Sequence, residues 1–178
     1  MAEADHDRAA FEGIEGRGTV DYLMRNTQQH LVALSSQADL KANIVITASA
    51  LLLTVGATRL NDDTYRVSVA LLAAGCVGAL VLAVLAVLPT ATRRTRPNGN
   101  RNPLFFVDAA AMDRAEFLAR LSDSCETDAQ IYRLQADDIH EFSRYLATSK
   151  FRRLRRAYLA FLVGVMAAFA HQLVQSLR

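Results

Sequence analysis

The sequence predicts an all-α integral membrane protein with three transmembrane helices and a small cytoplasmic juxtamembrane helical bundle. Three apolar blocks, 42–58, 67–88 and 157–177, contain no Asp, Glu, Lys or Arg. Mean hydropathy over the 178 residues is only +0.12 although 52% of the residues are hydrophobic, so the apolar residues are concentrated in these blocks. Outside the blocks, apolar residues recur at helical spacing. The formal net charge of +2 gives no reason to expect a nucleic-acid partner.

The first segment is expected to be a disordered acidic tail, 1–18, with five acidic residues and three glycines. No Gly or Pro then occurs until Gly56, so one helix is predicted from about residue 19 to 58, with Thr19 as its N-cap. Its part 19–41 is expected in the cytoplasm and its part 42–58 in the membrane. Seventeen residues span ~26 Å, slightly less than a hydrocarbon core of about 30 Å.

The second span, 67–88, is the strongest membrane signal, with twenty-two uncharged residues ended by Pro89. A basic loop, 89–107, follows and holds all three prolines of the chain. The third span, 157–177, is weaker because His171 and Gln172 lie near its end, and a buried helix of a soluble bundle is the alternative for this block.

Between the second and third spans, residues 108–156 are predicted to form cytoplasmic helices. Asp108 is expected to cap a helix over 109–121, and a long helix is expected to run from about 126 into the third span without interruption. The stretch 142–156 holds six basic residues and no acid, which is typical of a helix end at anionic lipid headgroups.

The distribution of basic residues predicts the orientation of a multi-pass inner-membrane protein. Only two basic residues lie in the connection 59–66, whereas many flank the other membrane ends. The positive-inside rule therefore places the N-terminus and the segment 89–156 in the cytoplasm. The residues that decide this are Arg93, Arg94, Arg96 and Arg101 after the second block, and Lys150, Arg152, Arg153, Arg155 and Arg156 before the third.

The sequence contains no constellation of catalytic or metal-binding residues. It has no phosphate-binding P-loop, no dinucleotide-binding glycine motif, no nucleophile elbow and no H-E-x-x-H zinc motif. Cys76 and Cys125 lack metal-ligand spacing, and no disulfide is expected between them. We therefore expect no enzyme, no metal and no cofactor. The absence of charged residues within the spans argues against a proton-coupled transporter.

Small residues recur at spacing four along the second span, in two stripes that allow close approach of another helix. Packing against the other spans of the same chain and packing in a homo-oligomer are both open, and a homo-oligomer is among the expected partners. One stripe is Ala70, Ala74 and Gly78, and the other is Gly75, Ala79 and Ala83.

Three stretches resemble the transmembrane effector family of Pycsar antiphage systems. In QADLKANIVITASALLLTV, 37–55, the positions Asp39, Lys41 and Asn43 mark the start of the first span. The stretch RNPLFF, 101–106, contains Asn102 and Pro103. The third stretch is SKFRRLRRAYLAFLVG, 149–164. The resemblance covers most of residues 20–165.

The resemblance implies a two-gene defence system acting at the lipid bilayer. A partner pyrimidine nucleotide cyclase would make cyclic UMP or cyclic CMP on phage infection. The effector would bind this ligand and impair the inner membrane, killing the cell before phage release. Other classes that fit the spans are a membrane scaffold or adaptor that docks a soluble partner, and a small channel or transporter subunit.

A nucleotide needs cations for its phosphate and an apolar surface for its base. The candidate residues are Arg93, Arg94, Arg96, Arg101, Phe105 and Phe106. Arginines that only set the topology, next to two aromatic residues at the membrane interface, are the alternative interpretation. For Asp39, Lys41 and Asn43, the two interpretations are an interfacial hydrogen-bond cluster that fixes the first span and direct ligand contact.

Overall fold

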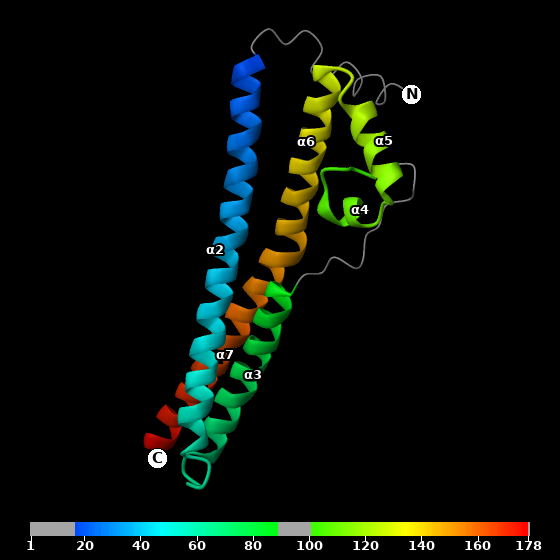
Figure 1. The fold of residues 1–178 in the computed structure, drawn as a ribbon. Helices are drawn as coiled ribbons and strands as arrows, with labels where there is room; N and C mark the ends of the chain where they lie inside the picture. The colour runs from blue at the N-terminus through cyan, green and yellow to red at the C-terminus, as the bar shows by residue number, and fades with distance from the viewer. Residues whose placement is uncertain (1–16, 89–100, 178) are drawn as a thin grey trace, which may run out of the picture. The chain divides into compact units, whose positions relative to one another are not determined.

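The structure, a computed structural model, describes residues 17–88 and 101–177. Every regular element in this part of the chain is helical, and three helices are long and apolar enough to cross a membrane (Figure 1). The predicted all-α fold with three membrane spans is therefore confirmed. The elements are α2 (Arg17–Ala57), α3 (Arg66–Val87), α4 (Phe106–Ala110), α5 (Arg114–Ser124), α6 (Asp128–Tyr145), the π-helical η3 (Leu146–Lys150) and α7 (Phe151–Ser176).

The described residues form two compact units. The polar unit consists of 17–33 and 101–145, and the membrane unit consists of 34–88 and 146–177. Helix α2 is unbroken from Arg17 to Ala57 and so contributes to both units. The helical stretch from Asp128 to Ser176 does the same through α6, η3 and α7. Most of the predicted acidic tail and basic loop, 1–16 and 89–100, lies outside the described residues.

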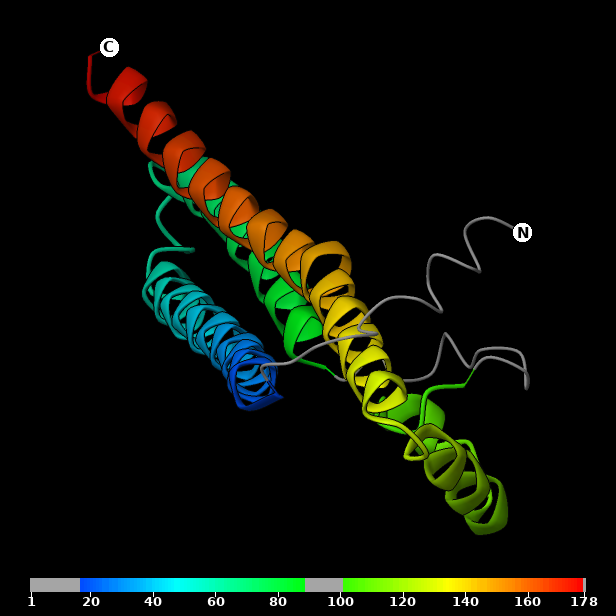
Figure 2. The same cartoon turned by 90° about the horizontal axis from the view of Figure 1, so that it is seen from above.

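The core of the membrane unit is built mainly from small side chains. Helices α3 and α7 lie against each other (Figure 2), and a Cβ atom placed on Gly75 would lie 2.4 Å from Cα of Gly164. The stripe Gly75, Ala79 and Ala83 therefore packs within the chain, whereas Ala70 and Ala74 of the other stripe are exposed. The buried core residues are Ala38, Ala42, Val45, Ala79, Ala83, Ala86, Leu154 and Ala157.

The polar residues near the end of the third span bind a serine on the second. Oγ of Ser68 lies 2.8 Å from Nδ1 of His171 and donates to Oε1 of Gln172 at 3.1 Å. These hydrogen bonds satisfy polar groups that would be costly to expose to lipid tails. The polar side chains that weakened the membrane signal of this block are thus paired between helices.

Two predicted helix starts are wrong. Thr19 lies inside α2 and is not its N-cap. Asp108 lies inside the short helix α4 and does not cap a helix over 109–121, because its carboxylate accepts a hydrogen bond from the backbone N–H of Asn102 at 3.1 Å. The cap is Asp113 instead, whose side chain accepts from the N–H of Glu116 at 2.8 Å and starts α5.

The long helix that enters the third span changes its winding on the way, which the sequence did not predict. Residues 146–150 form a π-helical segment between α6 and α7. Leu146 and Lys150, at its two ends, are both buried. Lys150 donates to Oγ of Ser35 at 2.9 Å and forms an ion pair with Asp39 at 2.7 Å. The wider turn thus coincides with a buried lysine that has two partners on α2.

Candidate functional site

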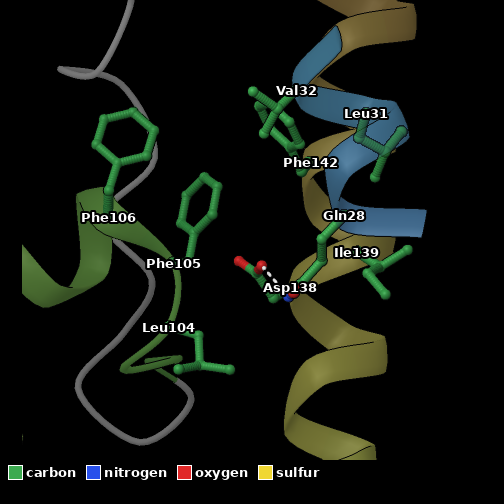
Figure 3. A pocket seen from close by; sticks show the side chains of 9 residues that line it. All are labelled: Gln28, Leu31, Val32, Leu104, Phe105, Phe106, Asp138, Ile139 and Phe142. Carbon is green, nitrogen blue, oxygen red and sulfur yellow. Dashed lines mark hydrogen bonds between the residues drawn. The ribbon is translucent and has the colours of Figure 1, made fainter. Parts of the chain in front are cut away.

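The polar unit contains a cavity of about 340 Å³ between helix α2, helix α6 and the segment 104–106. This volume lies at the lower end of the range of small-molecule sites, ~300–1,000 Å³. Seven of the nine side chains around it are apolar and two are polar. The lining residues are Gln28, Leu31 and Val32 of α2, Leu104, Phe105 and Phe106, and Asp138, Ile139 and Phe142 of α6 (Figure 3).

The segment RNPLFF forms one wall of the cavity, and Asn102 holds this wall in place. Its side-chain oxygen accepts from the N–H of Leu104 at 2.8 Å, and its side-chain nitrogen donates to the carbonyl of Leu134 on α6 at 3.4 Å. Asn102 and Pro103 are both buried. These two motif residues therefore position the segment, and the next three residues line the cavity.

Phe105 and Phe106 form the aromatic part of this wall. Their ring centroids are 5.5 Å apart and the ring planes are inclined by 50°, so the two rings do not stack on each other. The ring of Phe105 lies between its own segment and the side of the cavity formed by α2 and α6 (Figure 3). Phe106 is 57% exposed, although it lies outside the membrane unit. The structure thus brings both predicted aromatic residues to one cavity.

Among the residues that the structure describes, no predicted arginine lines the cavity together with Phe105 and Phe106. Arg101 is absent from the lining, and its Nη1 donates to the carboxylate of Glu116 at 3.3 Å and to the carbonyl of Ala111 at 3.2 Å. Its guanidinium thus connects the start of the RNPLFF segment to α5. Arg93, Arg94 and Arg96 lie outside the described residues.

The two polar lining residues, Gln28 and Asp138, were not predicted from the sequence. Nε2 of Gln28 donates to the carboxylate of Asp138 at 3.5 Å, the outer limit of a hydrogen bond (Figure 3). Burial raises the pKa of the Asp138 carboxyl above its ordinary value, and the hydrogen bond from Gln28 opposes part of this effect. Helical periodicity marks the inward face of each helix, but it does not indicate which residues 110 positions apart will meet.

We expect the stability of the polar unit to depend on pH through Asp138. Because its pKa is raised on folding, the folded chain keeps a proton that the unfolded chain has lost once the pH exceeds the ordinary aspartate value of 3.8. The free energy of unfolding therefore falls as the pH rises from 3.8 through the higher pKa that Asp138 has in the folded chain. The variant Asp138→Asn should lack this loss of stability. The melting temperature of the variant minus that of the parent protein should therefore increase with pH.

The matched control for this measurement is Asp123→Asn on α5, where the side chain is exposed. Its melting temperature should follow that of the parent at every pH. A constant difference between Asp138→Asn and the parent across the pH series would contradict the role assigned to burial of the Asp138 carboxyl.

The positions Asp39, Lys41 and Asn43 lie in the membrane unit and do not line the cavity. Asp39 pairs with Lys150, and the backbone carbonyl of Lys41 accepts from the hydroxyl of Tyr158 at 3.2 Å. The side chains of Lys41 and Asn43 are exposed. The three residues therefore do not form one cluster: two of them connect α2 to the helical stretch that ends in α7.

No group of three or more His, Cys, Asp or Glu side chains with the geometry of a metal site occurs in 17–88 or 101–177. Cys76 is buried, Cys125 is exposed, and both are free thiols. The described residues thus present a cavity with apolar walls and one polar pair, and, separately, three apolar helices long enough to cross a membrane.

Comparison with known proteins identifies a family. A family model described as "Pycsar effector protein domain" matches residues 23–175. No curated protein and no solved structure matches the chain. The matched range includes the first two membrane spans, the third up to residue 175, the RNPLFF segment and every residue around the cavity. The chain is therefore a membrane protein that belongs to the Pycsar effector family of antiphage defence proteins.

Proposed function

We propose that this effector is activated by a cyclic pyrimidine nucleotide, cyclic UMP or cyclic CMP, which a partner cyclase makes on phage infection. The activated protein impairs the inner membrane and ends the infection by killing the cell. The observation that carries this proposal is the family match over residues 23–175, which joins the three spans and the cavity in one domain.

The chain is built so that ligand binding acts on membrane helices. Residues of α2 line the cavity, and the same helix continues to Ala57 through the first span. Residues of α6 also line it, and the helical stretch from Asp128 continues to Ser176. Each of these two helices is therefore continuous with a span. A ligand that changes the position of either helix at the cavity would move the span as well. This supports a sensor and a membrane effector in a single chain.

In this proposal the N-terminus and the segment 89–156 face the cytoplasm, where the nucleotide is made. The supporting observation is the excess of basic residues next to the membrane ends on that side. Arg153 is one of them, and its Nη1 donates to the carbonyl of Leu85 near the end of α3 at 2.8 Å. The basic residue thus also satisfies a helix-end carbonyl.

The proposal is tested in cells that express the effector together with its cyclase and are then infected. A membrane-potential dye should report depolarisation before lysis, and the yield of phage should fall. Cells carrying a catalytically inactive cyclase should keep their membrane potential. Unchanged potential together with cell survival in the presence of the active cyclase would contradict the proposal and favour a membrane scaffold.

A further inference from the structure

The cavity of the polar unit has the surface chemistry of a site for a flat heteroaromatic ring. Its walls are apolar and partly aromatic, and both of its polar side chains belong to the single pair Gln28–Asp138. A planar base has two apolar faces and one edge with hydrogen-bond donors and acceptors. An apolar slot with one polar pair matches this distribution better than it matches a sugar or an ion.

The aromatic wall can supply a stacking face. The inclination of 50° between the rings of Phe105 and Phe106 means that neither ring covers the other in parallel. The ring of Phe105 lies between its own segment and the two helices, and Phe142 of α6 lines the cavity from the helix side (Figure 3). A base between them would contact aromatic carbon on both sides. Stacking of this kind stabilises single bases on protein surfaces whatever their sequence.

The polar pair retains hydrogen-bonding capacity for a base edge. At 3.5 Å its hydrogen bond is weak, and the amide nitrogen of Gln28 has a second N–H. The Asp138 carboxylate has several lone pairs beyond the one that Gln28 uses. The pair thus offers an acceptor beside a donor. On a pyrimidine edge, this complements the amino group and N3 of cytosine, or the N3–H and a carbonyl of uracil.

The carboxylate also sets the direction of the ligand. A cyclic nucleotide carries one negative charge on its phosphate, and an ionised Asp138 repels that charge in a partly buried site. The phosphate therefore lies away from the Gln28–Asp138 pair, and the base lies next to this pair. The exposed rim residues Leu104 and Phe106 would lose contact with water when the ligand binds, which favours binding.

The geometry points to this cavity as the base-binding site of the effector, with Phe105 as the stacking residue and Gln28 and Asp138 as the residues that bind the edge of the pyrimidine. This inference rests on the proposed function, because the cyclic pyrimidine nucleotide is taken from it.

The test is isothermal titration of the full-length protein in detergent micelles with cyclic CMP and cyclic UMP. Phe105→Leu keeps an apolar side chain but removes the aromatic face, and it should weaken binding by about tenfold. Asp138→Leu removes the acceptor for the base edge and should weaken binding by a similar factor. Circular dichroism and a melting curve establish that each variant is folded.

Two matched variants on α5 serve as controls, because their side chains do not line the cavity. Phe117→Leu repeats the change at Phe105, and Asp123→Leu repeats the change at Asp138. Both should bind like the parent. If the parent binds a cyclic pyrimidine and the two cavity variants bind it equally well, the site is wrong and the proposed function stands. If the parent binds neither nucleotide, the proposed function fails and this inference fails with it.

Discussion

Replacing Gly75 with alanine should force α3 and α7 apart and destabilise the membrane unit by about 1–3 kcal/mol. The added Cβ would lie 2.4 Å from Cα of Gly164 and 3.1 Å from the carbonyl oxygen of Ala160. Both are backbone atoms, so rotation of a side chain cannot relieve the clash. One of the two helices must move, and the small residues packed around the crossing lose contacts when it does.

The chain offers a matched control on the same helix. A Cβ added to Gly78 would meet nothing closer than Cβ of Ala160 at 4.0 Å, which is an ordinary contact. Gly78→Ala should therefore leave stability unchanged or raise it slightly, since alanine also favours the helix. The measurement is the temperature at which each purified variant loses helical circular dichroism in the same detergent. Equal transition temperatures for the two variants would show that the helices do not cross at Gly75.

Replacing Asp39 with leucine should destabilise the protein by about 2–4 kcal/mol, because it leaves a buried lysine without its counter-charge. The side chain of Lys150 is 8% exposed and forms an ion pair with Asp39 at 2.7 Å. Among the described residues, the hydroxyl of Ser35 then remains as the hydrogen-bond partner of the Lys150 ammonium group. Asp39 itself is 39% exposed, which limits the effect to less than that of a fully buried pair.

The double variant Asp39→Leu/Lys150→Met separates the loss of the ion pair from the cost of an unpaired charge. It should be more stable than Asp39→Leu alone, because neither charge then remains buried. Asp63→Leu is the control: this carboxylate pairs with Arg66 at 3.8 Å but is 99% exposed, so little change is expected. Chemical unfolding of the three variants in one detergent measures the differences. A double variant less stable than Asp39→Leu would contradict the burial of an unpaired Lys150.

The membrane spans were predictable from the sequence because they depend on local properties of the chain. A block of about twenty uncharged apolar residues crosses a bilayer as a helix whatever its neighbours are, since lipid offers no other partner for backbone N–H and C=O groups. The structure has helices over Arg17–Ala57 and Arg66–Val87, close to the predicted 19–58 and 67–88. The absence of Gly and Pro up to Gly164 likewise predicted a long helix from about residue 126, and the structure has a continuous helical stretch from Asp128 to Ser176.

The candidate site was predictable in part. The RNPLFF motif indicated Phe105 and Phe106, and the structure places both beside the cavity. Arg101 illustrates why the rest was not predictable. A cation near two aromatic residues in sequence fits a nucleotide site, but its guanidinium binds Glu116, fifteen residues away. Sequence proximity indicates which groups are near one another, whereas the direction of a long side chain depends on the helix packed beside it.

The sequence by itself determined the all-α class, the three spans and the family resemblance, since each follows from residue order along one segment. Only the tertiary structure decided which stripe of small residues meets α7 and which polar residues share the cavity. Asp113 is followed by Glu116 three residues later, a local capping signal that Asp108 lacks, and the carboxylate of Asp108 instead accepts from the N–H of Asn102. Gln28 and Asp138 are 110 positions apart in the sequence, and they meet only because the fold brings α2 and α6 to the same cavity.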